Sequence, residues 1–135
     1  MSRLAFTTVA ILSLAACSSG GATSGTTTGG PSGPTITMDG MSFSPSNLDV
    51  AAGATITVVN NDTLSAHTVT SEAVAAAYVK AQVDGGFTFD TGALMSGATA
   101  TISVPAGLAS GLVMPYFCEI HMATMNPPNP TITIK

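Results

Sequence analysis

Apolar and polar side chains alternate strictly along three stretches of the chain. In each stretch Val, Ile or Ala takes one set of positions and Thr or Ser takes the other, which is the pattern of a β-strand with one buried face. A fourth stretch, residues 113–117, is apolar and aromatic and predicts a buried strand. The alternating stretches are residues 54–58, 98–104 and 131–134.

Glycine and proline separate these predicted strands, and one segment between them has a different composition. Several short strands divided in this way are typical of a Greek-key sandwich. Residues 71–81 are rich in alanine and other helix formers and begin with Ser71 as an N-cap, so they predict a short helix between strands. We therefore expect an all-β fold, a Greek-key β-sandwich with one short helix, over residues 35–135. The predicted turns are residues 52–53, 85–86, 96–97 and 105–107.

Residues 1–16 have the features of a signal sequence. A single basic residue, Arg3, precedes an apolar run that is too short to cross a bilayer, which needs about 20 residues, but matches the core of a signal peptide. The run ends in Leu14-Ala15-Ala16-Cys17, which resembles the lipobox of bacterial lipoproteins, where the cysteine is lipidated. We expect a lipoprotein-type signal peptide and a lipid anchor on Cys17. An ordinary signal peptide with an incidental Cys17 is the alternative.

Residues 17–34 connect this cysteine to the predicted domain. After Cys17 they contain only Gly, Ser, Thr, Ala and Pro, so no large apolar side chain can compensate for the entropy lost on ordering. They predict a flexible linker that holds the domain away from a membrane surface. The protein is then exported and lipid-anchored to the bacterial cell envelope, with its domain on the periplasmic or extracellular side.

The charge balance argues against a nucleic-acid partner. Once Arg3 is removed with the leader, two lysines remain against seven acidic residues. Nucleic-acid binding needs a basic patch. The low charge density favours docking by apolar contact over strong electrostatic steering.

The candidate chemistry lies in the spacing C-x-x-H-x-x-x-M. Cys118, His121 and Met125 place a thiol, an imidazole and a thioether on one short loop after the predicted strand at residues 113–117. Soft sulfur ligands select copper, and two His with one Cys and a weak axial Met form an electron-transfer copper site. The fourth ligand must then be the only other histidine of the chain, His67.

The sequence at this point resembles the cupredoxin family of small blue (type 1) copper proteins, plastocyanin-like and azurin-like in its loops. The resemblance covers about residues 35–135 and implies one copper ion held by His67, Cys118, His121 and Met125, cycling between Cu(I) and Cu(II). Departures from the family pattern are Met114, the mixed loop spacing and residues 126–130. The matching features are Phe43-Ser44-Pro45, Asn60-Asn61-Asp62 before His67, Phe89-Asp90-Thr91-Gly92 and Tyr116-Phe117-Cys118.

Each candidate ligand has an ordinary alternative. Cys118 could be an inert buried thiol or could pair with Cys17, and His67 alone could be a core or surface histidine. Met122 competes with Met125 for the axial position, although it directly follows His121 and its side chain would point away from the metal. The resemblance also implies that Thr68, next to His67, connects the two ligand loops by a hydrogen bond. A solvent-facing strand threonine is the alternative.

Two function classes remain. The first is a monomeric one-electron carrier that docks redox proteins near His121, and the second is a copper storage, delivery or sensing module without redox traffic. An enzyme is not expected, because a Cys–His nucleophilic dyad needs an orienting third residue and a substrate pocket. Copper reductases and oxidases of this fold need more histidines than two. The resemblance implies an apolar docking surface around His121 formed by Met41, Ala66, Leu94, Met95 and Met122.

Overall fold

The computed structural model describes residues 32–135. The predicted signal peptide, Cys17 and the linker as far as Pro31 lie outside the described residues. The described chain forms β-strands and a single 3-10 turn, and no helix in it is long and apolar enough to cross a membrane. The elements are β1 (Thr35–Asp39), β2 (Ser42–Ser44), β3 (Asn47–Val50), β4 (Thr55–Asn60), β5 (Thr70–Ser71), β6 (Thr99–Ser103), β7 (Val113–Phe117), η1 (Met122–Thr124) and β8 (Thr131–Ile134).

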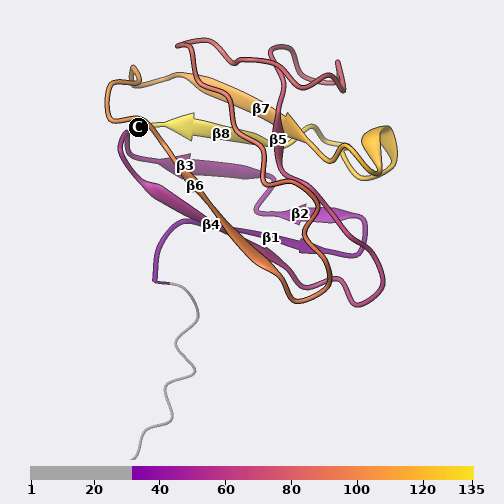
Figure 1. The fold of residues 1–135 in the computed structure, drawn as a ribbon. Helices are drawn as coiled ribbons and strands as arrows, with labels where there is room; N and C mark the ends of the chain where they lie inside the picture. Colours follow the sequence, from indigo (N-terminus) through magenta and orange to yellow (C-terminus); the bar gives the residue numbers. More distant parts are fainter. Residues whose placement is uncertain (1–31) are drawn as a thin grey trace, which may run out of the picture.

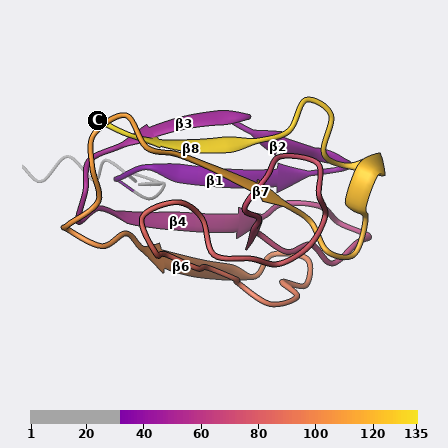
Figure 2. The same cartoon turned by 90° about the horizontal axis from the view of Figure 1, so that it is seen from above.

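The strands form two sheets that pack face to face (Figures 1 and 2). One sheet has the order β2-β1-β4-β6 and the other β3-β8-β7-β5. The pairs β1–β4 and β3–β8 are parallel, and the remaining pairs are antiparallel. Apart from the antiparallel neighbours β1–β2 and β7–β8, consecutive strands lie in different sheets. The predicted all-β sandwich is confirmed.

The core is formed by the alternate side chains of the strands that face the opposite sheet. Ile56 on β4 lies opposite Ile102 on β6, and both are buried. Ile132 and Ile134 on β8 are fully buried, while the threonines between them are half-buried. The three alternating stretches therefore form β4, β6 and β8, and the apolar stretch forms β7, as the sequence predicts.

The predicted helix over residues 71–81 is wrong. Ser71 belongs to β5, and the segment after it is a loop that returns so that Glu72 pairs with Lys80 in an antiparallel bridge. The backbones of Ser71 and Ala81 close the base of this loop, because the Ala81 amide donates to the Ser71 carbonyl at 3.0 Å. The single helical turn of the described residues is η1, on the loop after β7.

The side chain of Glu72 explains why the alanine-rich segment does not become a helix. Its carboxylate is fully buried and accepts hydrogen bonds from the backbone amides of Ala76 at 3.0 Å and Tyr78 at 2.8 Å. In a helix the Ala76 amide would instead donate to the Glu72 carbonyl. Both Ala76 and Tyr78 have positive φ, which interrupts a right-handed helix. A local side-chain acceptor has thus replaced the helical backbone bond.

Candidate metal centre

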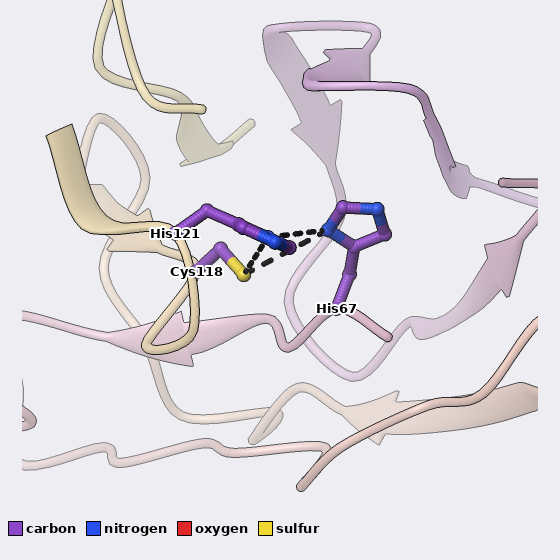
Figure 3. Close-up of side chains that lie close together, drawn as sticks. All are labelled: His67, Cys118 and His121. Atoms are coloured by element: carbon purple, nitrogen blue, oxygen red, sulfur yellow. Dashed lines mark hydrogen bonds between the residues drawn. The ribbon is translucent and has the colours of Figure 1, made fainter. Parts of the chain in front are cut away.

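Three side chains from two distant parts of the chain meet at one end of the sandwich (Figure 3). His67 precedes β5, whereas Cys118 directly follows β7 and His121 comes three residues later. The Cys118 Sγ atom lies 3.9 Å from Nδ1 of His67 and 3.6 Å from Nδ1 of His121. The two Nδ1 atoms are 3.0 Å apart. The predicted grouping of His67, Cys118 and His121 is therefore present.

These separations suit the ligands of one metal ion. Nitrogen and sulfur ligands of a first-row ion such as zinc lie about 2.0–2.3 Å from it, which places two ligands of the same ion about 3–4 Å apart. Cys118 and His67 are fully buried, and His121 is half-buried. A buried site with two imidazole nitrogens and one sulfur favours copper.

Asp62 determines which nitrogen of His67 faces the site. Its Oδ2 atom lies 2.9 Å from Nε2 of His67, on the far side of the ring from Nδ1. The Leu64 amide, and after it the His67 ring, hold the pKa of the Asp62 carboxyl below its ordinary value, so Asp62 is ionised at neutral pH and can only accept. Nε2 therefore carries the proton, which leaves the Nδ1 lone pair free for a metal.

Hydrogen bonds within the loop before His67 hold the Asp62 carboxylate in place. Asn60 is fully buried at the end of β4, and its side-chain amide donates to the carbonyls of Ser65 and Leu94. Its Oδ1 atom accepts the Asp62 amide at 2.9 Å. Asp62 Oδ1 in turn accepts the Leu64 amide at 2.8 Å. Sequence reasoning noted Asn60 and Asp62 only as family features, because their roles depend on the folded loop.

Thr68 connects the two ligand loops, as the resemblance implied. Its hydroxyl accepts a hydrogen bond at 2.8 Å from the backbone amide of Glu119, the residue that directly follows Cys118. Its own backbone amide points at the Cys118 sulfur, 3.4 Å away. Thr68 is buried, so the alternative of a solvent-facing threonine is excluded. The Thr68 amide places an N–H donor beside the sulfur atom that would bind a metal.

The loop after Cys118 is closed by Asn126, which sequence reasoning missed. Asn126 is fully buried, its Oδ1 atom accepts the Cys118 amide at 3.2 Å, and its side-chain amide donates to the Met122 carbonyl. The turn begins with the Met122 amide donating to the Cys118 carbonyl at 2.8 Å. A polar residue after a methionine gives no signal of this role in the sequence.

The two methionines of this loop have different environments. Met125 is 2% exposed and belongs to the core, whereas Met122 is 51% exposed and has a positive φ. Met125 also lines a cavity of about 220 Å³ with Phe43 and neighbouring residues. Burial favours Met125 for the axial position, in agreement with the sequence-based choice.

The residues predicted for docking are divided between surface and core. Met41, Met95 and Met122 are exposed, and Ala66 is half-buried. Leu94 is buried instead and pairs with His67 through two backbone hydrogen bonds, of 3.0 and 2.8 Å. Leu94 therefore supports the ligand loop from inside and does not contribute to the exposed surface.

A change of Met125 to Leu is expected to raise the reduction potential while copper is retained. The substitution conserves volume, so the core should tolerate it, but it removes a weak sulfur donor that tunes the potential. Voltammetry of the copper-loaded variant measures the shift. Met122→Leu is the matched control and should change the potential little, because that side chain is exposed. The reverse result would assign the axial role to Met122.

Comparison with known proteins agrees with this geometry. A family model described as copper binding proteins, plastocyanin/azurin family, matches residues 34–129, which is more than half of the chain. The chain belongs to this family of copper-binding proteins. A search of curated protein sequences finds no match.

Solved structures show the same fold at low sequence identity. A copper-containing nitrite reductase from Thermus scotoductus SA-01 aligns with 76% of this chain at 23% identity and a TM-score of 0.59, but the match spans only 22% of that enzyme. A purple cupredoxin from Nitrosopumilus maritimus aligns with 76% of this chain and 99% of its own length, at 20% identity and a TM-score of 0.54. An amicyanin from Paracoccus versutus aligns over 80% and 86% of the two chains, at 16% identity and a TM-score of 0.57.

The protein is thus a cupredoxin-fold, copper-binding protein. His67, Cys118 and His121 form its candidate site for one copper ion, and Met125 stays the predicted axial ligand.

Proposed function

We propose that the protein is a type 1 (blue) copper protein that carries single electrons in the cell envelope. The supporting observation is that the fold itself holds the ligands in place. Asp62 fixes the His67 ring, and the Thr68 amide is directed at the Cys118 sulfur. A ligand set held by the protein changes little between Cu(I) and Cu(II), so little reorganisation opposes electron transfer.

Burial of the sulfur favours a carrier over a storage or delivery module. Handing copper to another protein by ligand exchange requires a thiolate that the partner can approach. Cys118 and His67 are fully buried, and His121 is the most accessible of the three donors. Electrons could enter through the half-buried His121 side chain, whereas a copper ion held by Cys118 and His67 would be shielded from the ligands of a partner.

Repeated oxidation and reduction distinguishes these two functions. The copper-loaded protein is cycled with ascorbate and ferricyanide in the presence of a Cu(I) chelator. A carrier regains its visible thiolate-to-copper absorption after each cycle. Loss of copper to the chelator during the reduced phase would support delivery instead.

We also propose that the protein is not an enzyme. The described residues bring together one cluster of potential metal ligands, and it includes both histidines of the chain. The aligned nitrite reductase is a much longer protein, of which this chain matches about a fifth. Turnover of nitrite by the copper-loaded protein would contradict this proposal.

Redox partners are proposed to dock at an apolar face around His121, which we define as Met41, Ala66, Met95 and Met122. The turn that carries Met41 follows β1, and the loop that carries Ala66 follows β4. Because β1 and β4 are parallel, both lie at the same end of the sandwich. Methionine suits a surface that accommodates several partners. The protein is proposed to act as a monomer that contacts partners through this face.

Adding charge to the apolar face should slow electron transfer. Met41→Glu and Met95→Glu, separately and together, are expected to lower the electron self-exchange rate about tenfold or more, because a carboxylate would be buried at the contact. Line broadening in NMR spectra of mixed oxidised and reduced protein measures the rate, while the visible spectrum and the potential stay nearly unchanged. Val113→Glu adds the same charge at an exposed position on the opposite end of β7 and serves as the control. Equal rates in the double variant and the control would place docking elsewhere.

Attachment to the envelope is proposed to occur through lipid on Cys17. Cys17→Ser should block the modification, because the lipid is joined to the thiol. Membrane fractionation and mass spectrometry of the N-terminus measure the change. Release of a protein with an unmodified Cys17 from wild-type cells would contradict the anchor.

A further inference from the structure

A series of hydrogen-bonded polar side chains runs through the interior from the surface toward the metal centre. Its middle member is Thr70 on β5, which is fully buried. The Thr70 hydroxyl lies 3.0 Å from the hydroxyl of Thr68 and 3.2 Å from Oδ1 of Asp90. Asp90 is also paired with Lys80 and accepts the Gly92 amide at 2.8 Å. None of Thr70, Asp90 or Lys80 belongs to the group of metal ligands.

The number of available protons fixes the direction of these hydrogen bonds. A threonine hydroxyl has one proton to donate, and a carboxylate can only accept. The Thr70 hydroxyl therefore donates its proton to Asp90, since a hydrogen bond to a charged acceptor is about twice as strong as one to a neutral acceptor. The Thr68 hydroxyl then donates to Thr70 and still accepts the amide of Glu119. Every hydrogen bond of this series is donated in the direction of the Asp90 carboxylate, so the bonds strengthen one another.

At the inner end of this series of hydrogen bonds, Thr68 makes two contacts with the loop that carries Cys118. The Glu119 amide, which follows Cys118 directly, is bonded to the Thr68 hydroxyl at 2.8 Å. The Thr68 backbone amide is 3.4 Å from the Cys118 sulfur. Any movement of Thr68 would therefore change both the position of the cysteine loop and the N–H···S contact.

We propose that Thr70 is a positioning residue for the copper site. Its hydroxyl links the Thr68 hydroxyl to the Asp90 carboxylate, and Thr68 in turn fixes Cys118. Without this support the Thr68 amide withdraws from the sulfur. A thiolate that loses an N–H donor has more electron density to give to copper, which favours Cu(II) and lowers the reduction potential.

The test compares Thr70→Val with Thr70→Ser in the full chain. Valine has nearly the shape of threonine but cannot relay a hydrogen bond, whereas serine keeps the hydroxyl. We expect the Glu119 amide of the metal-free Thr70→Val protein to exchange with solvent at least tenfold faster than in the wild type. The copper-loaded form should have a lower reduction potential and a shifted thiolate-to-copper absorption band. Thr70→Ser should stay close to the wild type in all three measurements.

Thr99→Val is the matched control, since Thr99 is exposed on β6 in the other sheet. It should leave Glu119 exchange and the potential unchanged. Equal behaviour of Thr70→Val and Thr70→Ser would overturn the proposal. Faster exchange in both variants would show that Thr70 acts through packing alone. The exchange measurement needs no copper, so it is independent of whether the protein carries electrons.

Discussion

Cys118→Ala is expected to abolish the strong visible absorption that the wild-type protein gains when Cu(II) is added. This absorption arises from charge transfer between a cysteine thiolate and copper, and Cys118 is the one cysteine within the described residues. The variant removes a single buried sulfur from the edge of the core, so its loss of unfolding free energy should be about 1 kcal/mol. The sandwich should therefore remain folded.

Visible absorption and circular dichroism together measure this outcome. Cys118→Ser is a useful companion, because its hydroxyl can still accept the Thr68 amide but supplies no thiolate for the charge transfer. It should also be colourless. If Cys118→Ala kept the band, copper would be bound through another sulfur and the ligand assignment would be wrong.

Asp62→Asn is expected to weaken copper binding about 10–100-fold, which is the usual effect of removing the partner of a ligating histidine. The asparagine can still accept the Leu64 amide, but it can donate its own N–H to Nε2 of His67. That bond favours the tautomer with the proton on Nδ1, the nitrogen that faces the site. Metal binding at Nδ1 then requires the proton to move back to Nε2 of His67.

Competition with a copper chelator measures the affinity, and NMR of the metal-free protein reports the His67 tautomer. Asp39→Asn removes the same charge from an exposed position and is the control. If the two variants lost affinity equally, the effect would come from net charge, and the contact between Asp62 and His67 would have no part in holding the metal.

Sequence reasoning succeeded where the information is local. The alternation in β4, β6 and β8 follows directly from one buried face, and the loop from Cys118 to Met125 carries its ligands within eight consecutive positions. His67 was joined to them because it is the only other histidine of the chain, and the family resemblance supported this choice; no local pattern reveals a partner 51 positions away.

The failures involve side chains whose role depends on distant or folded neighbours. Residues 71–81 have helical propensity, but the buried Glu72 carboxylate captures their backbone amides. β5 has only two residues, too few for a periodic pattern. Asp62 and Asn126 look like ordinary loop residues until the backbone brings them against His67 and Cys118.

The place of β8 in its sheet has a consequence for the order in which the protein assembles. β8 is the last strand of the domain, yet it lies between β3 and β7, and β3 pairs with it alone (Figure 1). A chain that emerges N-terminus first therefore cannot complete this sheet until residues 131–134 are available. β7, which leads into Cys118, lacks one of its two neighbours until then. The loop that carries Cys118, His121 and Met125 is accordingly held at both ends by paired strands only once the C-terminal residues have joined the sheet.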